Sequence, residues 1–104
     1  MLPTRLSQFL RAAVLTALLV AAGCQTAPVQ EMSDARQAIT VAREAGAEEH
    51  AADDLKAAVN YLQSAEKFLY KREYNLARRD ALQAKSSALD ALRRTEDNEE
   101  AEPR

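Results

Sequence analysis

The sequence holds little of the material from which catalytic and metal sites are built. Its 104 residues include one cysteine, one histidine and no tryptophan. The cysteine has no partner for a disulfide within the chain, and His50 lacks the further Cys and His ligands of an ordinary zinc site. No second histidine is present to activate a serine nucleophile. We therefore expect no enzymatic activity, no metal and no cofactor.

Glycine and proline are also scarce. The chain has two glycines and three prolines, so it contains no glycine-rich loop of the kind that holds phosphate. Gly and Pro break helices, whereas Ala, which is abundant here, is the strongest helix former. The composition therefore predicts an all-α protein.

The central part of the chain has no excess of either charge. Eleven acidic and eleven basic residues lie between Cys24 and Arg94. A nucleic-acid binder would need a one-sided basic excess, so we expect no nucleic-acid partner and no small-molecule substrate. Residues 95–104 carry five acids, one base and no large apolar side chain. This composition predicts a disordered acidic tail.

The first 23 residues have the organisation of an export signal. A polar start with Arg5 and Arg11 precedes an uncharged, predominantly apolar run over residues 12–22. Such a basic start, short apolar centre and small residues at the end are typical of a cleaved secretory signal. The run is shorter than the about 20 residues that a helix needs to cross a bilayer.

The end of this run, Ala21-Ala22-Gly23-Cys24, resembles the lipobox of bacterial lipoproteins, although Leu is commoner than Ala at the first position. The resemblance implies cleavage between Gly23 and Cys24 and a diacylglyceryl group on the Cys24 thiol. Residues 1–23 would then be the signal peptide and 24–28 the lipidated cysteine and linker. In a Gram-negative host, Gln25 rather than Asp implies the periplasmic face of the outer membrane.

Three segments of the body have helical spacing: residues 29–45, 52–71 and 74–94. Gly46 is well placed to end the first, because Gly readily adopts the left-handed conformation found just past a helix. The turn between the second and third is short, which predicts antiparallel neighbours. We expect an antiparallel helical hairpin or a three-helix bundle.

Small and large apolar residues form separate stripes on these helices. In the second segment, Leu55, Leu62 and Leu69 recur every seven residues. In the third, alanines repeat at spacings of four and three, which places them on one helix face. A core of alanines buries little area per residue, so we expect self-association or a helical partner.

Two resemblances support this fold. The hairpin resembles one degenerate tetratricopeptide repeat. The residues at matching positions are Tyr61, Ser64, Ala65 and Phe68, followed by Tyr74, Ala77 and Ala84. One such repeat cannot form a solenoid.

The body from Pro28 to Ala91 contains the run PVQEMSDARQAITVAREAGA and later the spacing Tyr74-x2-Ala77-x3-Ala81-x2-Ala84. In these features it resembles a family of small bacterial lipoproteins that carry the domain of unknown function numbered 4398. The His50-Ala51-Ala52 segment departs from the Tyr-Ala-Pro often found there. The resemblance implies an exported, helical protein and brings no established activity.

One part of the body has the composition of an interaction surface, since aromatic and Arg residues are enriched at such surfaces. The basic and aromatic candidates are Tyr70, Lys71, Arg72, Arg78 and Arg79, and the apolar candidates are Leu82, Leu89 and Leu92. The alternative is that Tyr61, Phe68 and Tyr74 are core residues with helix-end cations around them. Tyr70 lies off the leucine stripe, so we expect it to be exposed.

These observations favour a non-enzymatic lipoprotein of the cell envelope, attached to a membrane through Cys24. Its helical body would act as a structural or protein-interaction module. The alternative is a periplasmic accessory module that binds peptidoglycan or a nascent envelope protein through the basic and aromatic residues.

Overall fold

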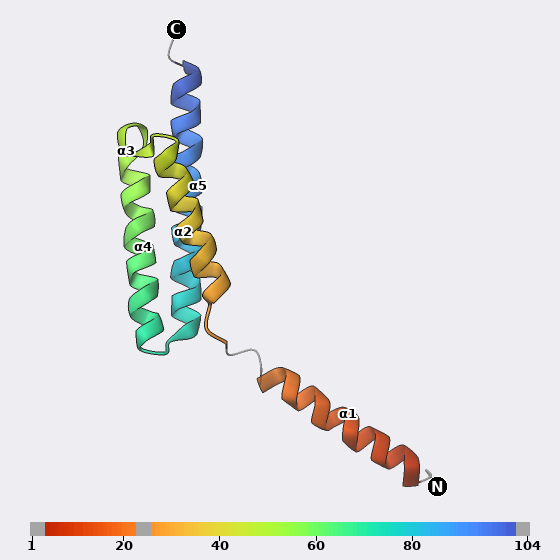
Figure 1. Cartoon of the computed structure of the whole chain (residues 1–104). Helices are drawn as coiled ribbons and strands as arrows, with labels where there is room; N and C mark the ends of the chain where they lie inside the picture. Colours follow the sequence, from red (N-terminus) through yellow and green to blue (C-terminus); the bar gives the residue numbers. More distant parts are fainter. Residues whose placement is uncertain (1–3, 23–25, 102–104) are drawn as a thin grey trace.

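The structure is a computed structural model that describes residues 4–22 and 26–101. All regular secondary structure in these residues is helical, which confirms the all-α prediction. The helices are α1 (Thr4–Ala22), α2 (Val29–Glu44), α3 (Ala47–His50), α4 (Ala52–Tyr70) and α5 (Tyr74–Ala101). α2, α4 and α5 pack side by side as a three-helix bundle, with α4 antiparallel to the other two (Figure 1).

The core of the bundle is lined mainly by alanine. Seven alanines of α4 and α5 are completely inaccessible to solvent, and they are Ala58, Ala65, Ala77, Ala81, Ala84, Ala88 and Ala91. Larger side chains fill the space at either end, with Met32 near the α4–α5 turn and Leu55 near α3. Leu62 packs against both groups of core residues. Small side chains let the helix axes approach closely. The resulting van der Waals contacts between helices offset the small apolar area that each alanine buries.

Both helix-ending turns use left-handed backbone. Gly46 follows α2 with φ 102°, a conformation that glycine adopts without steric cost. Arg72 follows α4 with φ 60°. There, the Glu73 N–H donates to the Phe68 carbonyl at 2.9 Å and the Arg72 N–H donates to the Leu69 carbonyl at 3.0 Å. This is the Schellman pattern, and it reverses the chain so that α5 returns along α4.

The segment between α2 and α4, expected to be a simple connection, contains the one-turn helix α3. Gly46 precedes its first residue, and Glu48 and Glu49 occupy its first turn, where negative charge suits the helix dipole. Ala47 is fully buried in the core. α3 therefore closes the end of the bundle opposite the α4–α5 turn.

The prediction of a disordered tail from residue 95 is wrong for Thr95–Ala101, because α5 continues as helix to Ala101. Thr95 is fully buried, and its Oγ1 donates to the Ala91 carbonyl at 2.8 Å. The Asn98 amide donates to the His50 carbonyl at 3.2 Å. This part of α5 packs against α3. The composition of the tail alone gives no sign of that contact. Residues 102–104 of the predicted tail lie outside the described residues.

This arrangement predicts different effects of two truncations. In chains that begin at Gln25, removal of every residue after Arg94 should lower the free energy of unfolding by about 1–2 kcal/mol, because the buried Thr95 side chain and the Asn98 hydrogen bond are lost. Removal of residues after Asn98 should change it by less than about 0.5 kcal/mol, since the described residues that are lost, 99–101, are all exposed. Thermal melting followed by circular dichroism measures both. Equal melting temperatures for the two chains would show that Thr95 contributes nothing.

Candidate functional site

The N-terminal helix is separate from the bundle. Among the residues that the structure describes, α1 makes no helix–helix contact with α2–α5, and it leads away from them (Figure 1). Its Leu6, Phe9, Leu10 and Val14 side chains are exposed. No helix in the described ranges is long and apolar enough to cross a membrane. The predicted cleavage and lipidation residues, Gly23 and Cys24, lie outside the described residues.

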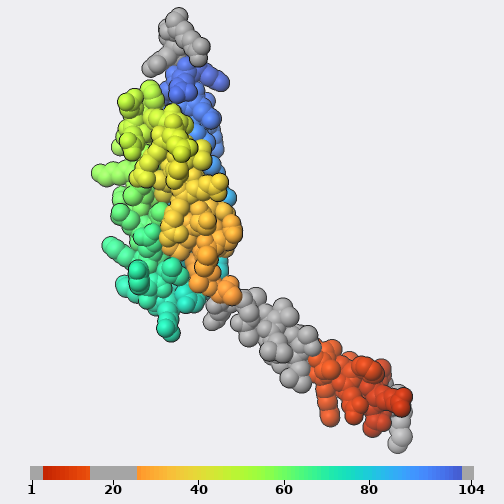
Figure 2. Space-filling view, in the orientation of Figure 1, coloured from red at the N-terminus to blue at the C-terminus, as the bar shows by residue number. Residues whose placement is uncertain are grey.

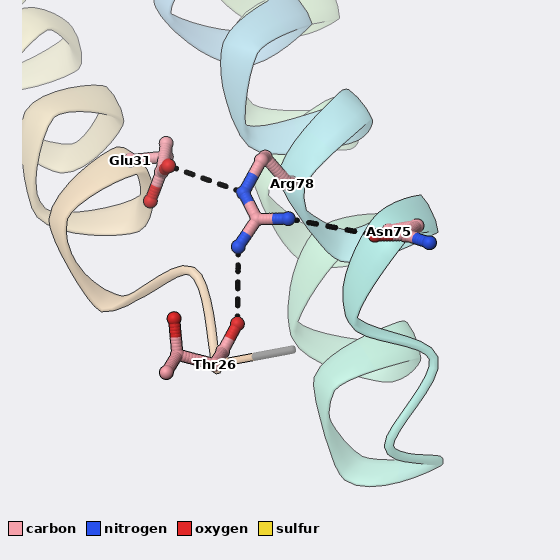
Figure 3. Close-up of polar contacts among 4 residues, drawn as sticks. All are labelled: Thr26, Glu31, Asn75 and Arg78. Atoms are coloured by element: carbon pink, nitrogen blue, oxygen red, sulfur yellow. Dashed lines mark hydrogen bonds and ion pairs between the residues drawn. The ribbon is translucent and has the colours of Figure 1, made fainter. Parts of the chain in front are cut away.

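The linker that follows is fixed to the bundle by Arg78 (Figure 3). The Arg78 guanidinium donates from Nη2 to the Thr26 carbonyl at 3.0 Å and from Nε to Glu31 Oε1 at 3.2 Å. A third, longer contact joins Nη1 to Asn75 Oδ1 at 3.5 Å. Pro28 is almost fully buried behind this network. Arg78, predicted as part of an interaction surface, is therefore engaged within the protein and holds the chain just after Cys24 against α5.

Tyr70, Lys71 and Arg72 form the end of the hairpin, called here the hairpin tip. Tyr70 is 90% exposed, in agreement with its position off the leucine stripe. Lys71 and Arg72 are also exposed, and neither makes an ion pair within the described residues. Phe68 and Tyr74 are half-buried beside them. The tip therefore presents one aromatic ring and two cations to its surroundings.

Arg79 lies on another face and has an internal partner. It donates from Nε to Asp80 Oδ1 at 3.1 Å, and Ser64 Oγ donates to Asp80 Oδ2 at 2.5 Å. The Asp80 carboxylate is only 5% exposed, between α4 and α5. Tyr61 and Asn60 border the same open depression, which has a volume of about 480 Å³. The Ser64–Asp80 hydrogen bond links α4 to α5. Arg79 belongs to this cluster and is not part of the hairpin tip.

Sequence reasoning missed Asp80, although a signal was present. Asp80 stands three residues after Ala77 and four before Ala84, so it shares the buried alanine face. A carboxylate on such a face needs hydrogen-bond donors, and Ser64 supplies one from α4. Within the described residues, no buried side-chain nitrogen or oxygen lacks a hydrogen-bond partner.

The predicted leucine stripe of α5 is divided by the fold. Leu82 and Leu89 are 51% and 42% exposed, whereas Leu92 is partly buried against the core. Val41 of α2 is 41% exposed. α2 and α5 run parallel and are joined by the ion pairs Glu31–Arg78 and Asp34–Lys85.

The two ion pairs join residues 47 and 51 positions apart, so this register brings Val41 level with residues 88–92 of α5. We call Val41, Leu82 and Leu89, three exposed apolar side chains on these two packed helices, the α2–α5 seam. The other predicted stripe, on α4, is internal, because Leu55 is buried and Leu62 and Leu69 pack against the core.

The surroundings of His50 offer no assembled metal site. Glu49, His50, Asp53 and Asp54 border one shallow depression, but the Asp54 carboxylate pairs with Arg94 at 2.9 Å. Within the described ranges, no group of three or more His, Cys, Asp or Glu side chains is placed to hold a metal ion.

The geometry defines a small all-α protein: a three-helix bundle, closed at one end by α3, with a separate N-terminal helix. The family model described as Domain of unknown function (DUF4398) matches residues 30–102, so the chain belongs to this family. The match covers α2–α5, including the part of α5 beyond Arg94. No curated protein and no solved structure matches the chain.

Proposed function

We propose that the protein is a lipoprotein of the cell envelope, held to a membrane by lipid on Cys24, whose bundle acts as a structural or protein-interaction module rather than as an enzyme. The supporting observation is the independence of α1 from the bundle. The described contacts of the body start at Thr26, two residues after Cys24. Cleavage before Cys24 would therefore remove α1 and leave every described contact among α2–α5 intact.

The proposed location follows from the lipobox and the residue after it. Gln25 is the sorting residue expected for the outer membrane of a Gram-negative host. The bundle would then stand on the periplasmic face. Two or three acyl chains would hold it firmly, since a single chain gives only marginal, reversible binding.

Mass spectrometry of the protein extracted from the envelope tests the anchor. The expected mature chain begins at Cys24 and carries acyl chains on it. A chain that retains Met1, or a mature chain with an unmodified Cys24 thiol, would contradict the proposed anchoring.

The α2–α5 seam is the surface that we propose for protein contact. Its three side chains are each more than two-fifths exposed and lie on adjoining helices. A grouped, exposed apolar surface on a small protein usually marks a contact region, and the flanking Glu31–Arg78 and Asp34–Lys85 pairs would form a polar rim. The proposed occupant is a helix, either from a second copy of this chain or from another envelope protein.

Substitution of the seam tests this role. Leu82→Ser together with Leu89→Ser should weaken association about tenfold or more while the melting temperature changes little, because both side chains are largely exposed. Sedimentation of the lipid-free body and cross-linking in cells measure association. Val29→Ser is the matched control, since Val29 is 69% exposed and lies at the start of α2 away from the seam.

A monomeric wild type without a cross-linked partner would contradict this use of the seam.

Retention of the wild type on isolated peptidoglycan, lost in Tyr70→Ala, would instead favour the accessory binding module.

A further inference from the structure

The first described residues after Cys24 join the bundle near the hairpin tip. Thr26 is held against Arg78 at 3.0 Å, and it lies on the side of Arg78 that faces the α4–α5 turn (Figure 3). Arg78 is four residues from Tyr74, about 6 Å along the axis of α5. Cys24 precedes Thr26 by two residues, which reach at most about 7 Å. An anchor at Cys24 can therefore lie level with the tip.

The space-filling view gives the same arrangement (Figure 2). The linker joins the bundle at the end where the α4–α5 turn lies, and the C-terminal part of α5 lies at the opposite end. The Arg78 network makes this a fixed relation, because one α5 side chain holds both the linker, through Thr26, and α2, through Glu31. Lipid on Cys24 would thus hold the bundle by its turn end.

The chemistry of this end suits the surface of an anionic membrane. Tyr70 is almost fully exposed, and tyrosine is enriched at membrane–water interfaces, where its ring and hydroxyl meet both environments. Lys67, Lys71 and Arg72 are exposed without ion pairs within the described residues, and Glu73 is the acid among them. The turn therefore carries a net positive charge.

The opposite end of the bundle has the opposite charge. The exposed acids of α3 are Glu48 and Glu49, and those at the end of α5 are Glu96, Asp97, Glu99 and Glu100. Arg94, the nearest cation on α5, is paired with Asp54. A negatively charged membrane repels this end and attracts the tip, so the charge distribution favours the same orientation as the tether.

We propose that the hairpin tip rests on anionic phospholipid headgroups beside the lipid anchor, so that the bundle stands on the membrane with its acidic end pointing away. The proposal rests on the lipidation of Cys24. Each Lys or Arg near such a surface increases partitioning about fivefold.

The absence of tryptophan permits a direct test. The full acylated protein carrying Tyr70→Trp is reconstituted into vesicles of phosphatidylethanolamine and phosphatidylglycerol. Its fluorescence should shift to shorter wavelength and be quenched by lipids brominated on their acyl chains. Asp97→Trp, an exposed site at the acidic end, is the matched control and should show neither effect. In vesicles of phosphatidylcholine alone, the quenching of Tyr70→Trp should fall.

Charge reversal completes the test. Lys71→Glu with Arg72→Glu, in the Tyr70→Trp chain, should abolish the shift while the protein still floats with the vesicles, because the acyl chains remain. If the acylated protein floats with the vesicles but the Tyr70→Trp fluorescence is as solvent-exposed as that of Asp97→Trp, the docking of the tip is overturned. The lipid anchor would stand in that case. Equal quenching in anionic and uncharged vesicles would overturn the assignment to anionic lipid. Loss of flotation in the parent protein would overturn the lipid anchor, and this proposal with it.

Discussion

Cys24→Ser should abolish membrane attachment and leave an uncut precursor that still contains Met1. A serine hydroxyl cannot form the thioether that carries the diacylglyceryl group, and the signal peptidase of lipoproteins acts on the lipidated form. Acyl chains contribute about 0.8 kcal/mol for each methylene that enters the bilayer. Without the thiol this contribution is lost altogether.

Envelope fractionation followed by mass measurement of the intact chain records this outcome. Gln25→Asn is the matched control: it changes the adjacent residue, keeps an amide side chain and should leave acylation unchanged. A Cys24→Ser protein of mature length in the membrane fraction would exclude the cysteine as the point of attachment.

Leu62→Asp should unfold the bundle. Leu62 packs against both groups of core residues, between Met32, Ala65 and Ala81 on one side and Ile39, Leu55 and Ala88 on the other. The substitution removes a large, partly buried apolar side chain, at a cost of about 2–5 kcal/mol, and places a carboxyl group against the apolar core. Small domains have a total stability of only about 5–15 kcal/mol, and this alanine-rich core should lie near the lower limit.

Gln63→Asp is the control for this substitution, because Gln63 is the next residue of α4 and is exposed. Far-ultraviolet circular dichroism of chains beginning at Gln25 should show a folded, cooperatively melting Gln63→Asp protein and a largely unfolded Leu62→Asp protein. Similar melting of the two would mean that the interior face of α4 is misassigned.

The all-α fold could be predicted because its signals are local. Glycine is present where α2 must end and almost nowhere else, and the spacing of the alanines identifies one face of α5. The three predicted segments, 29–45, 52–71 and 74–94, overlap α2, α4 and the first part of α5. Each of these features acts within a few turns of helix, so a single sequence is enough to show it.

The features that could not be predicted depend on residues far apart in the chain. The sequence alone gives no partner for Arg78, because its hydrogen-bond acceptor Thr26 lies 52 positions earlier in the chain. The helical continuation past Arg94 depends on α3, which the composition of the tail does not reveal. Leu92 is partly buried, whereas Leu82 and Leu89 are exposed, and this difference depends on where α2 packs. Tertiary contacts decide each of these points.

The alanine core has a mechanical consequence. An alanine side chain has no rotamer to change, so an interior built from it loses almost no side-chain entropy on folding and has few ways to rearrange afterwards. Such a body should move as one rigid piece. α5 alone extends over 28 residues, about 40 Å. Anything bound at the acidic end would therefore be held at a nearly constant distance from the other end, which would make the bundle a spacer of fixed length.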